Sequence, residues 1–63
     1  MNQSAHDLYD EGNSKIAVGD IEAAAEFYRK SIEVDKEFFD GWHALGMALM
    51  KLGKMKEAIG AAI

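Results

Sequence analysis

Two histidines and nearby carboxylates are the side chains of this sequence best suited to metal chemistry. If the chain forms helices, His6 on one helix and Asp40 with His43 on another could converge, and imidazole with carboxylate is a ligand set that transition metals accept. The set spans two helices, contains no pair of histidines four residues apart and lacks a fourth ligand. We therefore interpret these residues as ordinary groove histidines, predict no metal or other cofactor, and keep a metal-dependent role as the weaker alternative.

Groups for covalent or acid–base catalysis are scarce. The chain has no cysteine, no serine in a strand-to-helix nucleophile motif and no glycine loop that would cradle a phosphate. Asp10 and Glu11 are neighbours in sequence, which is more typical of the solvated face of a helix than of an acid and base pair. The sequence therefore predicts a protein that is not an enzyme.

Length limits the core that the chain can build. Its 63 residues make at most one small domain, and a chain of that size buries only about 60% of the surface that it exposes when unfolded. Without cysteine, disulfides cannot compensate. Helix packing or self-association has to supply the missing stability.

Charge argues against nucleic acid as a partner. The formal net charge is −4 and no stripe of Lys or Arg overrides it. The charge is uneven, because residues 1–40 hold ten acidic residues against four Lys or Arg and residues 41–63 hold one against three. One end of a copy could therefore attract the other end of a second copy.

Membrane and secretion signals are missing from the sequence as given. No apolar run approaches the length of a membrane span, and "MNQSAHDLYDE" lacks the basic and then apolar order of a signal peptide. We expect a soluble, cytoplasmic chain.

Apolar and small residues recur every three or four positions, which predicts helices. The candidate side chains would therefore be positioned by helices. Ser4 with Asp7 resembles a capping box for a first helix, Gly19 is placed to end it, and Asp20 can cap a second helix. The two apolar stripes are Ala5, Leu8, Gly12 and Ile16, followed by Ile21, Ala24, Ala25, Tyr28 and Ile32.

The same pattern returns later in the chain. Gly53 is expected to separate a third helix from a fourth. The later stripes are Trp42, Leu45, Gly46 and Leu49, followed by Met55, Ala58, Ile59, Ala62 and Ile63.

Corresponding residues in the two halves are separated by 34 positions, which indicates an internal repeat. The repeat explains the glycines: Gly12 and Gly46 would let paired helices approach closely, and Gly19 and Gly53 would turn the chain. The matching pairs are Leu8 and Trp42, Gly12 and Gly46, Gly19 and Gly53, Ile21 and Met55, and Ala24 and Ala58.

A 34-residue helix–turn–helix unit with W-x2-L-G in "WHALG" resembles the tetratricopeptide repeat. Ala24, Tyr28 and Ala58 match the small and aromatic positions of the second helix of that unit. The resemblance implies an all-α fold of antiparallel helical hairpins, about 1.75 repeats with four helices, the last truncated. We predict one domain over 1–63, with repeat one at about 5–38 and a partial repeat two at about 39–63.

The resemblance also implies a concave groove lined by the first helix of each hairpin, which would bind a peptide or partner helix as a scaffold or adaptor does. Helical phase and the 34-residue shift place the following residues on that face: His6, Tyr9, Asn13, Asp40, His43, Met47 and Met50.

The best-known ligand contact of the family is a clamp for a C-terminal carboxylate. Asn13 matches one of its asparagines, but Tyr9 replaces its lysine and Ala44 replaces the second asparagine. We therefore expect no clamp, and instead an apolar contact that includes adaptable methionines. Packing of Met47 and Met50 on a neighbouring helix is an equal alternative.

The junction between the repeats departs from the family pattern. Lys36 stands where the family usually has proline, and the chain contains no proline at all. "SIEVDKEFFDGWHAL" could continue as one helix, but we expect a turn, with Asp40 as a helix cap and Gly41 as a weak point in the helix.

The last predicted helix, "KMKEAIGAAI", is too short to be stable without neighbours. The chain is then either a fragment of a longer repeat array or a unit completed by a second copy. We predict a homo-oligomer, formed by stacking or by domain swapping through an opened junction near Lys36. A purely structural role as an oligomerisation unit is the alternative to partner binding.

Overall fold

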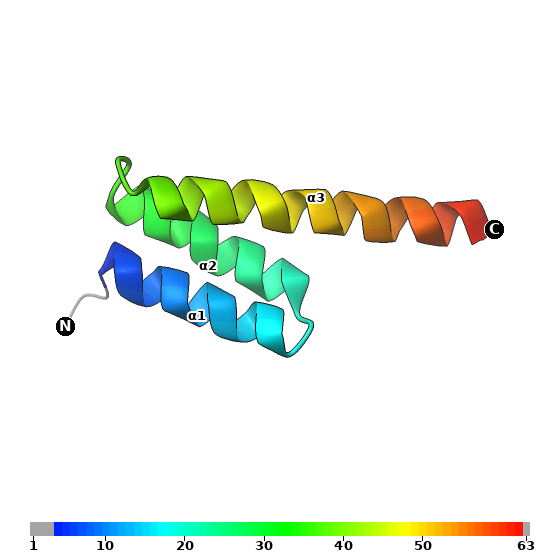
Figure 1. Cartoon of the computed structure of the whole chain (residues 1–63), viewed down its shortest axis with the longest axis horizontal. Coiled ribbons are helices and arrows are strands. Elements are labelled where there is room, and N and C mark those ends of the chain that lie inside the picture. The colour runs from blue at the N-terminus through cyan, green and yellow to red at the C-terminus, as the bar shows by residue number, and fades with distance from the viewer. Residues whose placement is uncertain (1–3, 63) are drawn as a thin grey trace.

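The computed structural model describes the backbone of residues 4–62 and the side chains of residues 4–56. This part of the chain forms three helices and no strand: α1 (Ala5–Ala17), α2 (Ile21–Val34) and α3 (Phe39–Ala62). Figure 1 shows α1 and α2 as an antiparallel hairpin and α3 running along the other side of α2. The predicted all-α class is confirmed.

The predicted ends of the first two helices are confirmed. The Ser4 hydroxyl accepts a hydrogen bond from the Asp7 N–H at 3.1 Å, and the Asp7 carboxylate accepts one from the Ser4 N–H at 3.4 Å. Gly19 follows α1 with φ of +82°, a conformation that costs a residue with a Cβ about 1–2 kcal/mol. The Asp20 carboxylate then caps α2 by accepting from the Ala23 N–H at 3.2 Å.

The junction between α2 and α3 turns without proline, as expected. The Asp35 carboxylate accepts a hydrogen bond from the Glu37 N–H at 3.0 Å, and the Asp35 carbonyl accepts one from the Phe38 N–H at 3.1 Å. This aspartate-centred turn ends the helix and takes over the role of a proline. The Trp42 indole N–H donates to the Lys36 carbonyl at 2.8 Å and so ties the turn to α3.

Two details predicted for the start of α3 are wrong. Asp40 is not the cap, because α3 begins at Phe39 and Asp40 lies within its first turn. Gly41 is not a weak point but a close contact between helices: a Cβ there would come within 2.6 Å of the Ser31 Oγ and 2.9 Å of the Ile32 Cγ2.

The prediction of four helices is also wrong, because α3 continues through Gly53 to Ala62. The sequence around this glycine explains the difference. Gly19 precedes Asp20, whose carboxylate caps the next helix, whereas Gly53 precedes Lys54, which has no acceptor with which to cap one. Among the described glycines, Gly19 is the one with positive φ.

Continuity of α3 also changes the burial of its predicted apolar stripe. Leu45 is buried against α2, but Trp42 and Leu49 are exposed, because no second helix of the hairpin returns over them. The stripe predicted from Met55 to Ile63 lies, apart from exposed Met55, outside the described side chains.

Helix α2 forms the centre of the core and packs on both of its neighbours. The buried cluster joins α2 to α3 and consists of Ala24, Ala25, Tyr28, Ile32, Leu45 and Ala48. From α1, Ala5 and Leu8 are buried as well. No helix within residues 4–62 has the length and low charge needed to cross a bilayer.

Gly12 and Tyr28 set the distance between α1 and α2. A Cβ on Gly12 would come within 2.5 Å of the Tyr28 Cε1 and 2.7 Å of its Cδ1, so the ring occupies the space that a side chain would need. The Tyr28 hydroxyl donates a hydrogen bond to the Asn13 Oδ1 at 2.5 Å. This close approach is the role that the sequence predicted for Gly12.

Replacing Gly12 by alanine should destabilise the fold. Alanine favours a helix by about 1 kcal/mol relative to glycine, but the clash with a buried ring should outweigh that gain and leave a net loss of about 1–3 kcal/mol. Gly46→Ala is the matched control, because nothing lies within 4 Å of a Cβ at that position. Urea unfolding in dilute solution should show the control to be more stable than the parent, and an equally stabilised Gly12→Ala variant would contradict the packing.

Stability should fall at alkaline pH through Tyr28. Burial, with a smaller contribution from the Tyr9 phenol, raises the pKa of the Tyr28 hydroxyl above its ordinary value. The folded state therefore holds this proton more tightly, so the contribution to stability is complete below about pH 10 and is lost as the pH rises through the folded pKa.

The Tyr28→Phe variant tests this titration by chemical unfolding between neutral and alkaline pH. It should lose about 1 kcal/mol at pH 7 with the hydrogen bond to Asn13 and should show a smaller alkaline loss than the parent. Tyr9→Phe keeps the Tyr28 hydroxyl and should retain the alkaline loss. Identical pH profiles for the parent and Tyr28→Phe would contradict the assignment.

Candidate functional site

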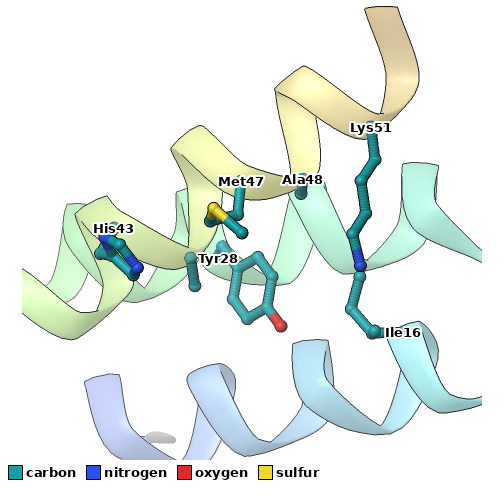
Figure 2. Close-up of a pocket in the computed structure, with 7 residues that line it drawn as sticks. Ile16, Tyr28, His43, Met47, Ala48 and Lys51 are labelled. Carbon is teal, nitrogen blue, oxygen red and sulfur yellow. The ribbon is translucent and has the colours of Figure 1, made fainter. Parts of the chain in front are cut away.

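Helices α1 and α3 both pack on α2, and a hollow of about 240 Å³ remains between them. Figure 2 shows the ring of Tyr28 between α3 and α1, where it forms the floor. The hollow is lined by Ile16 of α1, Tyr28 of α2, and His43, Ala44, Met47, Ala48 and Lys51 of α3.

The wall formed by α3 repeats every helical turn. His43, Met47 and Lys51 are spaced by four residues and therefore lie along one side of the helix. Figure 2 shows Met47 beside the Tyr28 ring and Lys51 extending towards Ile16. The wall thus offers an apolar, adaptable centre with a cation at one end and an imidazole at the other.

The floor is neutral and rigidly held. Tyr28 is only 3% exposed, and its hydroxyl is engaged by Asn13. A phenol is protonated at neutral pH, and burial raises the pKa of Tyr28 further. The floor therefore presents an uncharged aromatic surface.

An aromatic cluster adjoins the floor at the side of the α2–α3 turn. The ring centroid of Tyr9 lies 5.7 Å from that of Tyr28 and 5.5 Å from that of Phe38, in an edge-on arrangement with the latter. The His6 ring lies 6.2 Å from Tyr9 and 6.3 Å from Phe38. Contacts of this geometry are stabilising and link α1 to the turn.

The residues predicted for the groove divide into three groups. His43 and Met47 line the hollow. Tyr9 and Asn13 contact its floor, since the Tyr9 ring packs at a tilt against Tyr28 and the Asn13 Oδ1 accepts a hydrogen bond from the Tyr28 hydroxyl.

The other three predicted residues lie away from the lining. Asp40 and Met50 are exposed. His6 is exposed as well, and its Nδ1 lies 3.3 Å from the Asp10 Oδ2 one turn along α1.

Some lining residues were missed by the sequence analysis. Lys51 continues the spacing of His43 and Met47 by one turn, so helical phase could have found it. Tyr28 was assigned to the core alone, although its ring is both core and floor. Ile16 and Ala48 carry no polar group that would have drawn attention to them, whereas Ala44 was identified as the replacement of a clamp asparagine.

The side chains that lie close enough to His6 to bind a metal ion with it are not Asp40 and His43, which the sequence analysis considered, but two carboxylates of α1. Within the described residues, His6, Asp7 and Asp10 offer ligand atoms within 4.8 Å of one another, and all three are exposed. Asp7 belongs to the capping box and Asp10 pairs with His6, so ordinary surface roles account for the group.

Comparison with known proteins agrees with the architecture. A family model described as tetratricopeptide repeat matches residues 8–38 and 39–59. An uncharacterized protein of Methanocaldococcus jannaschii is 40% identical over 40 residues, which cover 64% of this chain and 46% of that protein. The chain thus spans about half the length of this curated relative. No solved structure matches the chain significantly. Since the two matched segments take up most of its length, the chain belongs to the tetratricopeptide repeat family.

Proposed function

We propose that this chain is a protein-interaction module, a scaffold or adaptor that binds a peptide or partner helix in the hollow between α1 and α3. Membership of a family of protein-interaction repeats supports the general role. The observation that carries the proposal is the apolar hollow itself, walled by Met47 and floored by the Tyr28 ring. Exposed Met side chains over an aromatic floor suit contact with varied apolar side chains.

The size of the hollow favours a side chain over an enclosed small molecule. Ligand pockets usually measure about 300–1,000 Å³, whereas this hollow measures about 240 Å³ and is open to solvent. One large aliphatic side chain of a partner fits that volume. The neighbouring groove face, with Tyr9, Asn13 and His43, would contact the flanking residues of the partner.

Lys51 adds a preference for charge. Its ammonium group stands at one end of an otherwise apolar wall and would attract a carboxylate next to the bound aliphatic side chain. The net charge of −4 supports protein rather than nucleic acid as the partner. We infer no chemistry at the site, because the Tyr28 hydroxyl is buried and held by Asn13.

Binding can be tested with a short peptide that carries one leucine followed by one glutamate among serines and alanines. Titration of the peptide into the chain, followed by the methyl resonances of methionine, should give a saturable shift at Met47. Met55, which is exposed further along α3, is the internal control and should not shift. A Met47 resonance that does not saturate, or equal shifts at both methionines, would refute the groove.

Charge reversal at Lys51 tests the proposed preference. Lys51→Glu should weaken binding of the leucine–glutamate peptide by about threefold to tenfold at low salt, in line with a single exposed ion pair. A peptide with lysine in place of the glutamate should bind Lys51→Glu more tightly than it binds the parent chain. If Lys51→Glu binds both peptides with the same affinity as the parent chain, Lys51 does not contact the peptide and the proposed charge preference is wrong.

Self-association is the second candidate function. The observation that favours it is an uncovered apolar face of α3, which includes Trp42 and Leu49 and does not line the hollow.

A further inference from the structure

One face of α3 is apolar and has no cover among the described residues. Its members recur every three or four positions and are Phe39, Trp42, Gly46, Leu49 and Gly53, hereafter the Trp42 face. Phe39 is 76% exposed, Trp42 50% and Leu49 46%. Nothing lies within 4 Å of a Cβ built on Gly46 or Gly53.

The repeat shows what should cover this face. On α1, the residues 34 positions before Phe39, Trp42 and Gly46 are buried, and Gly12 receives the ring of Tyr28. The same shift of 34 positions maps the start of α2 onto the last part of α3, residues 54–62, which we name the arm. The α1 equivalents of Phe39, Trp42 and Gly46 are Ala5, Leu8 and Gly12.

The arm cannot cover the Trp42 face of its own chain. Since α3 is one helix, position 62 stands about 24 Å along the axis from Gly46. Figure 1 shows this end of α3, coloured orange to red, extending beyond the α1–α2 turn. Each copy therefore carries an uncovered face and, further along the same helix, the segment whose repeat position fits such a face.

We propose that two copies of this chain exchange their arms, each arm packing on the part of the Trp42 face of the other copy that runs from Gly46 to Gly53. The occupant is a second copy because the arm has the repeat position that covers this part of the face and its own chain holds it out of reach. Phe39 and Trp42 lie beyond the arm in this arrangement. The two contacts are identical, so they close a dimer with two-fold symmetry. This exchange rests on self-association, the second candidate function, and is independent of peptide binding, because it leaves the lining of the hollow free.

The contact between Gly12 and Tyr28 fixes the register of the exchange. Adding 34 to both positions pairs Gly46 of one copy with position 62 of the other, in the antiparallel sense of α1 and α2. The midpoint between positions 46 and 62 is position 54, so the two-fold axis passes beside Gly53 and Lys54. Glycine at 46 and 53, with alanine at 62, lets the two helices approach closely there.

Charge near the axis gives the exchange a distinctive salt dependence. Lys54 and Lys56 are exposed and would gather from both copies around the axis. Their repulsion is screened by salt, so added salt should strengthen the dimer. Stacking of the acidic end of one copy on the basic end of another would respond in the opposite direction.

The mass of the full chain in solution tests the proposal, by light scattering after size exclusion across a dilution series. The parent should form a dimer that dissociates on dilution. Gly46→Lys places a long charged side chain on the Trp42 face and should raise the dissociation constant at least about tenfold. Met47→Lys adds the same charge one residue along, on the side of the hollow, and should change the constant less than about twofold.

Oxidative crosslinking tests the register. The chain has no cysteine, so each single-cysteine variant reports one position. Gly53→Cys, beside the axis, should form a disulfide-linked dimer, and Met47→Cys should remain unlinked under the same conditions. Circular dichroism of each variant checks that the helices are retained.

The possible outcomes separate the two proposals. A chain that stays monomeric at every concentration, equal effects of Gly46→Lys and Met47→Lys, or a dimer weakened by salt would overturn the exchange and leave the Trp42 face to a different partner. Met47→Lys that loses the peptide but keeps the dimer would support both proposals. Failure of the peptide titration alone would leave the exchange standing.

Discussion

The contact between Gly12 and Tyr28 is the constraint on which the rest of this structure depends. The Tyr28 ring occupies the space that a side chain on Gly12 would fill, so α1 lies close to α2 and Asn13 comes within hydrogen-bonding distance of the phenol. The same ring lies under α3 as the floor of the hollow. Packing and the candidate site therefore share one side chain, and a change in the helix spacing would alter both.

The sequence predicted those helix ends that depend only on residues near them in the chain. The capping box at Ser4, the left-handed Gly19 and the Asp20 cap each depend on atoms within a few residues, and all three are present. Gly53 shows the limit of that reasoning. The repeat treats Gly53 as the equivalent of Gly19, yet a turn needs a cap and a packed second helix to offset the backbone hydrogen bonds that it breaks. Lys54 supplies no cap, and the helix continues.

The site was predicted in part for a related reason. Helical phase is a property of one helix, so it placed His43 and Met47 on the correct side of α3. Whether a residue on that side lines a hollow depends on the spacing of α1 and α3, which the sequence does not reveal. Tyr9 and Asn13, which the sequence places on the same face, also contact Tyr28. Lys51, which the sequence analysis did not single out, lines the hollow that remains between α1 and α3.

Two sides of α3 carry different surfaces, and this separation has a consequence for binding. His43, Met47 and Lys51 border the hollow, whereas Gly46 and Leu49 belong to the Trp42 face, so occupation of one leaves the other accessible. A dimer formed by arm exchange would carry two hollows at a fixed separation. A partner with two suitable segments would bind the second one at a high effective concentration. Weak capture of single side chains in a hollow this small could then give useful affinity, because the dimer contributes the second contact.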